Sequence, residues 1–177
     1  MIQNEKHHMN DIDVLRHLVA TLAYRAAKAV RDVPAEFPHA SVSPNTRRPI
    51  LIVAHLADLM AWALPLADGR SEWSAGGGDD WHEEVERFFA GLEALDRRLA
   101  SSPPSAESIQ KLIQGPLADA LTHVGQLAML RGMTGAPVRP ESYARAPVVR
   151  GQVGIEQAPP AHEFNGDASV RRERSSG

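Results

Sequence analysis

Two histidines, His55 and His123, stand among apolar residues in segments with helical periodicity. His55 follows Ile52 by three residues, and His123 follows Ala120 by three and precedes Leu127 by four, so each lies on or beside a buried helix face. Neutral imidazole is a ligand for zinc, nickel, copper and iron. Two histidines that face one interior from different helices can therefore begin a metal site. The alternative is that each imidazole is an ordinary core residue with a local hydrogen bond, and spacing alone favours that alternative.

Four further residues could complete such a site. Asp58 lies one turn after His55, where it could be a ligand or could accept a hydrogen bond from that imidazole. His82 and Glu86 have the i, i+4 spacing of a chelating pair, although such a pair near a helix start is more often solvated. His162 lies in the C-terminal part of the chain. The sequence does not choose among them.

Composition excludes several kinds of chemistry. The 177 residues contain no cysteine, so disulfides, thiolate zinc sites and cysteine nucleophiles are excluded. Nineteen basic residues against 22 acidic ones give a net charge of −3 without a basic stripe, so no nucleic-acid partner is expected. The N-terminal sequence lacks a signal-peptide pattern, and a cytoplasmic location is expected.

One apolar run, residues 49–67, has about the length of a membrane span. It contains His55 and Asp58, and a carboxylate in the middle of a membrane is costly. We therefore expect a buried helix of a soluble protein and no membrane partner.

Apolar side chains recur at helical spacing in four segments, which predict helices over residues 11–31, 46–67, 81–100 and 105–133. Asn45 or Thr46 is expected to cap the second helix, with Pro49 in its first turn. Asp80 is expected to cap the third helix. The Gly115-Pro116 pair is expected to interrupt the fourth, and Gly135 to end it.

Four helices that each carry one apolar stripe bury those stripes most simply in an all-α, up-down four-helix bundle, with or without a crossover. We expect residues 1–138 to form this bundle. Residues 139–164, rich in proline and glycine, are expected to be an extended segment that wraps the same domain. Residues 165–177 are expected to be a mobile polar tail.

The stretch ILIVAHLADLMAWAL, followed by GPLADALTHVGQLAMLRGMTGAPV, resembles the DinB-like four-helix-bundle superfamily of metal-dependent enzymes. The resemblance covers about residues 14–164, and VVRGQVGIEQAPPAHEF is similar to the extended C-terminal segment of some members. Members of that superfamily use one histidine on the second helix and a His-x-x-x-His pair on the fourth. Carried over, His55 and His123 would be metal ligands, but Leu127 stands at the third position and Gln126 beside it is a poor ligand.

The resemblance implies a divalent-metal-dependent enzyme, with zinc or nickel as the metal. The reaction would be a transfer that uses a low-molecular-weight thiol, or a hydrolysis. The metal would lower the pKa of the bound thiol or water. The partners would be a small-molecule substrate or thiol and a second copy of the chain in a homodimer. No catalytic residue is assigned. Because the third histidine is missing, the alternative is a non-catalytic, small-molecule-binding or dimeric scaffold protein with a degenerate metal site.

Overall fold

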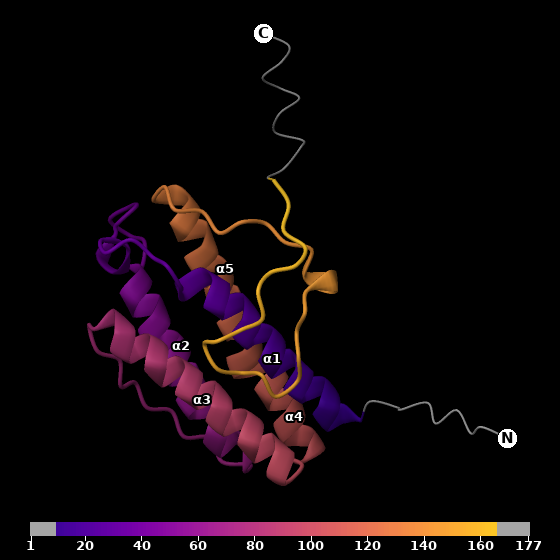
Figure 1. Cartoon of the computed structure of the whole chain (residues 1–177). Coiled ribbons are helices and arrows are strands. Elements are labelled where there is room, and N and C mark those ends of the chain that lie inside the picture. Colours follow the sequence, from indigo (N-terminus) through magenta and orange to yellow (C-terminus); the bar gives the residue numbers. More distant parts are fainter. Residues whose placement is uncertain (1–9, 166–177) are drawn as a thin grey trace, which may run out of the picture.

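Helices make up most of the computed structural model, which describes residues 10–165 (Figure 1). The long elements are α1 (Asp11–Val30), α2 (Pro49–Ala67), α3 (Trp81–Ser101), α4 (Ala106–Leu112) and α5 (Ala118–Met133). A π-helical turn, η2 (Ile113–Leu117), joins α4 to α5, and η1 (Phe37–His39) and η3 (Tyr143–Arg145) are 3-10 turns. Over the described range there is no strand, only an isolated bridge between Glu141 and Glu163. The all-α prediction is confirmed.

Local residues set most of the helix ends. Asp80 accepts a hydrogen bond from the backbone N–H of Glu83 at 2.9 Å, as expected of the cap of α3. The expected cap of α2 by Asn45 or Thr46 is wrong, because the N-cap residue is Arg48 and no side chain caps this helix. Pro49 explains the difference: its ring disfavours helical backbone in the residue before it, so Arg48 is extended and α2 starts at the proline.

The fourth rod of the bundle is bent where the sequence predicts an interruption. Gly115 has a non-helical backbone, with φ −95° and ψ −106°, and Pro116 follows it inside the π turn. A proline lacks the N–H of the helical ladder, so the rod consists of α4 and α5 on either side of a kink. At the far end Gly135 has a φ of +87° and ends α5, as predicted.

The chain direction does not alternate as the predicted up-down bundle requires. α1 and α2 each pack against α3 and α5. Arg87 donates to the carbonyl oxygen of Ala54 at 2.9 Å, and Arg98 pairs with Asp68 at 2.6 Å, so residue numbers rise together along α2 and α3. These two helices are therefore parallel, and α3 lies antiparallel to α1, where Arg16 pairs with Asp96 at 2.8 Å. The structure corrects the simple alternation to a bundle with a crossover.

Residues 68–80, the crossover strap, make this topology possible. They run without helix or strand from the end of α2 back to the start of α3 (Figure 1). The backbone N–H of Gly76 donates to Asp58 at 3.1 Å. A Cβ on Gly77 would lie 2.6 Å from the Cβ of Ala54, so only glycine lets the strap approach α2 this closely.

Gly91 likewise lets α3 pack closely against α2, because a Cβ there would lie 2.6 Å from the Cβ of Met60. Gly91→Ala is expected to lower the free energy of unfolding by about 1–3 kcal/mol through overpacking. Gly125→Ala is the matched control. Nothing lies within 4 Å of that added Cβ, so the change should raise stability by up to about 1 kcal/mol through helix propensity. Urea unfolding followed by circular dichroism measures both, and equal effects would contradict this account of the helix packing.

The C-terminal arm, residues 139–164, lies against α1. The hydroxyl of Tyr24 donates to Glu141 at 2.9 Å, and the ammonium of Lys28 lies 2.7 Å from Glu141 and 3.0 Å from Glu163. Two segments distant in sequence are thus joined by a buried charge cluster. Of the predicted tail, residues 166–177 lie outside the described part of the chain.

α2 is the apolar run identified in the sequence, and it is the one described helix long and apolar enough to cross a membrane. Inside the bundle 67% of its apolar window is buried, as in the core helix of a soluble protein. The expected cytoplasmic location stays a prediction.

Candidate metal centre

Three side chains from two helices converge on one point: His55 of α2 and Asp119 and His123 of α5. One ligand atom from each lies within 4.8 Å of the other two. The Nε2 atom of His55 is 3.3 Å from one carboxylate oxygen of Asp119, and the Nε2 atom of His123 is 3.5 Å from the other. The two imidazole rings have centroids 4.8 Å apart and stand at 90°. This arrangement can hold a metal ion.

The antiparallel packing of α2 and α5 produces this convergence. Asp119 and His123 are four residues apart, so they lie on the same face of α5, one turn apart. Toward the kink, a Cβ on Gly115 would lie 3.1 Å from the indole of Trp62. Gly115 thus leaves room for the indole of Trp62 beside the kink.

The cluster is partly open to solvent. The side chain of His123 is 12% exposed, that of His55 25% and that of Asp119 47%. Trp73 of the crossover strap lies beside His55, with ring centroids 5.8 Å apart, and Trp62 lies against Trp73 at the same separation. Trp73 therefore lies over the cluster beside His55, with Trp62 behind it, while Asp119 is the most exposed of the three.

Gln126 orients the ring of His123. The Nδ1 atom of His123 lies 2.8 Å from Oε1 of Gln126, so a proton on Nδ1 would be donated to this oxygen. In that tautomer of neutral imidazole the Nε2 atom, which lies 3.5 Å from the carboxylate of Asp119, carries the lone pair and is available to a metal ion. Gln126 would then be the hydrogen-bond partner of the ring nitrogen that does not bind the metal. Such an outer partner is typical of histidines that bind metals.

The donor set fits a divalent transition metal. Two imidazole nitrogens and one carboxylate oxygen suit zinc, nickel or iron(II), and three protein ligands leave positions for a substrate. These three donors do not select one metal.

Gln126→Leu tests the orienting contact. The variant removes the acceptor for Nδ1 while it keeps the bulk of the side chain, and we expect metal affinity to fall about 10–100-fold, as for other outer partners of metal-bound histidine. Gln126→Glu is the matched variant, because it restores an acceptor and should recover the affinity. Isothermal titration with zinc measures both, and unchanged affinity in Gln126→Leu would contradict this role.

The other candidates from the sequence lie elsewhere. Asp58 is buried, pairs with Arg87 at 2.7 Å and accepts from the backbone of Gly76, so it is neither a ligand nor the partner of His55. Glu86 is exposed on α3, and His162 lies in the C-terminal arm. Neither belongs to the cluster.

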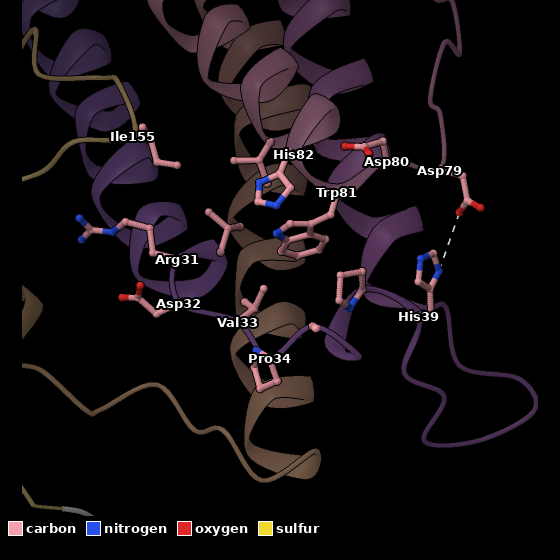
Figure 2. A pocket seen from close by; sticks show the side chains of 14 residues that line it. Arg31, Asp32, Val33, Pro34, His39, Asp79, Asp80, Trp81, His82 and Ile155 are labelled. Atoms are coloured by element: carbon pink, nitrogen blue, oxygen red, sulfur yellow. Dashed lines mark ion pairs between the residues drawn. The ribbon is translucent and has the colours of Figure 1, made fainter.

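His82 lines a different cavity, of about 590 Å³, between the end of α1 and the start of α3 (Figure 2). The figure shows His82 and the indole of Trp81 on this cavity, with His39 facing Asp79 at one edge at 3.9 Å. The predicted His82 and Glu86 pair therefore belongs to another region of the molecule and takes no part in the cluster.

Asp119 is the member that sequence reasoning missed. The third position was sought four residues after His123, where Leu127 is fully buried in the core. The same helix face continues four residues before His123, and Asp119 occupies it. An Asp-x-x-x-His spacing on one helix was the signal that could have found it.

No known protein family, curated protein or solved structure matches the chain. Fold and cluster together define a helical-bundle protein with a two-histidine, one-carboxylate group that can hold a metal ion.

Proposed function

We propose that the protein is a divalent-metal-dependent enzyme of the DinB-like type, with His55, Asp119 and His123 as metal ligands. The observation that carries this proposal is the convergence of the three side chains within 4.8 Å. The resemblance calls for one histidine on the second helix and a pair spaced by four on the last. Asp119 and His123 have that spacing on α5, with an aspartate in place of one histidine.

A divalent metal held there would supply Lewis-acid chemistry that lowers the pKa of a thiol or water and makes it a nucleophile at neutral pH. The reaction class we propose is transfer to a low-molecular-weight thiol. By accepting a proton from Nδ1 of His123, Gln126 would leave Nε2 for the metal, and Asp119 would supply the one negative charge among the ligands. Trp73 and Trp62 limit access of water beside His55.

Metal analysis of protein purified without an affinity tag tests the metal site. Near-stoichiometric zinc or nickel, lost in the His55→Ala, His123→Ala double variant, is the expected result. If neither protein retains metal under any loading condition, the metal-dependent function is wrong. The protein is then better described as a small-molecule-binding or scaffold protein.

Thiol consumption tests the reaction class. Metal-loaded protein is mixed with a small thiol and an electrophile such as an epoxide or an aryl halide, and loss of free thiol is followed with time. We expect consumption above the uncatalysed rate with the natural chain and consumption at the uncatalysed rate with the double variant. Full metal loading without any acceleration across a panel of electrophiles would contradict a transferase.

We also propose that the chain forms a homodimer. Met133 on α5 is 59% exposed and Leu51 on α2 is 42% exposed, so apolar surface is present for a partner. Multi-angle light scattering that gave the monomer mass at micromolar concentration would exclude the dimer.

A further inference from the structure

A cavity of about 390 Å³ adjoins the candidate metal centre. Its walls come from the loop that precedes α2, from the first turn of α2 and from residues 123–130 of α5, and His123 is one of its lining residues. The volume lies within the range of pockets for small molecules. A ligand in this cavity therefore lies next to one of the three ligand side chains.

Arg47 is the one residue lining this cavity whose side chain is permanently charged. Its neighbours in the wall include the neutral polar residues Asn45 and Thr46 and the apolar residues Ile52 and Met129, and no carboxylate. Arg47 is exposed, and its guanidinium has no ion pair or hydrogen bond with residues 10–165. A guanidinium in this state is free to bind a planar anion with two parallel hydrogen bonds.

The charge of the loaded cluster points the same way. Two neutral imidazoles and one carboxylate leave one unit of a dication's charge uncompensated. This residual charge and the guanidinium of Arg47 together give the cavity a positive potential, which favours a negatively charged ligand.

Resting on the proposed metal-dependent function, we infer that the cavity selects a small carboxylate-bearing substrate or thiol. Its carboxylate would pair with Arg47, its short aliphatic stem would lie against Ile52 and Met129, and its other end would point toward His123, the one residue of the triad that lines the cavity. A single arginine flanked by neutral polar groups suits a monoanionic carboxylate better than a phosphate, for which several donors are usual.

Cobalt-loaded protein gives a direct readout, because a thiolate that binds cobalt(II) produces a charge-transfer absorption band. We propose titration with mercaptopropionate and with mercaptopropanol, which share the thiol and differ in the carboxylate. The natural chain should bind mercaptopropionate about 10- to 100-fold more tightly, the usual range for a hydrogen-bonded charge. Arg47→Met should lose this preference.

Arg48→Met is the matched control. It removes the same charge from the neighbouring exposed residue, which does not line the cavity, so the preference should remain. Equal affinities for the two thiols in the natural chain would overturn the inference, and so would an equal loss of the preference in Arg47→Met and Arg48→Met. In either case a cobalt–thiolate band would show that the metal site itself still binds. Failure to bind cobalt at all would instead overturn the proposed function, and this inference with it.

Discussion

Asp119→Asn is expected to lower zinc affinity by more than about 100-fold, beyond the loss that follows removal of an outer partner of a metal ligand. The variant keeps the size of the side chain and removes the only negative charge of the triad, so the ion would face two neutral imidazoles and an amide. Competition with a chromophoric chelator measures this affinity. Asp119 is half exposed, so the folded state should be little affected.

Glu86→Gln serves as the control, because Glu86 is an exposed carboxylate on α3 that the structure places outside the triad. Its zinc affinity should equal that of the natural chain. Affinity should also fall on acidification in both proteins, because imidazole must release its proton to bind a metal. Equal affinities for Asp119→Asn and the natural chain would exclude Asp119 as a ligand.

Lys28→Met is expected to lower the free energy of unfolding by about 3–5 kcal/mol, the usual result of removing one partner from a buried ion pair. The ammonium of Lys28 is 6% exposed and the carboxylate of Glu141 is fully buried. Without Lys28 the negative charge of Glu141 would keep only Tyr24 and backbone groups as partners. Chemical denaturation at neutral pH measures the change.

The control is Arg139→Met, which removes a 62% exposed cation that pairs with Glu163 at 3.2 Å in the same arm. A surface pair of this kind contributes about 0–1 kcal/mol, so the two variants should differ several-fold. Similar losses in both would show that the buried cluster does not hold the arm to α1.

Stability should also fall in acid because of the same cluster. Burial alone raises the pKa of Glu141, but hydrogen bonds from Lys28 and Tyr24 outweigh it and hold the pKa below its ordinary value of 4.5. A depressed pKa in the folded state adds stability above the pKa of the unfolded state, and this is lost as the pH falls through the folded value. Glu141→Gln should therefore show a shallower loss of stability below pH 4.5 than the natural chain in denaturation titrations.

The helices were predictable because their signals are local. Periodic apolar residues set the length of each helix, and Asp80, Pro49 and Gly135 mark ends that the structure retains. The direction of α3 was not predictable, since a loop such as residues 68–80 can either turn back at once or return along the bundle. Which of these occurs depends on contacts between distant residues, among them Gly76 with Asp58 and Arg98 with Asp68.

The candidate site was half predictable for a similar reason. His55 and His123 are rare polar residues on or beside apolar helix faces, which made them candidates, but their convergence became visible only in the fold. Asp119 is exposed at the rim, where carboxylates are common and carry no signal of their own. Asp58 looked equivalent by spacing along α2, but only the fold shows that Arg87 takes up its charge.

The crossover strap has a consequence for protein engineering. Surface connections usually accept deletions, yet this one must return along a helix of 19 residues, about 30 Å, and an extended chain needs at least about nine residues for that distance. Trimming the strap below that length would force α3 to run antiparallel to α2. It would also move Trp73 away from His55. The connection is therefore a poor place to shorten the chain.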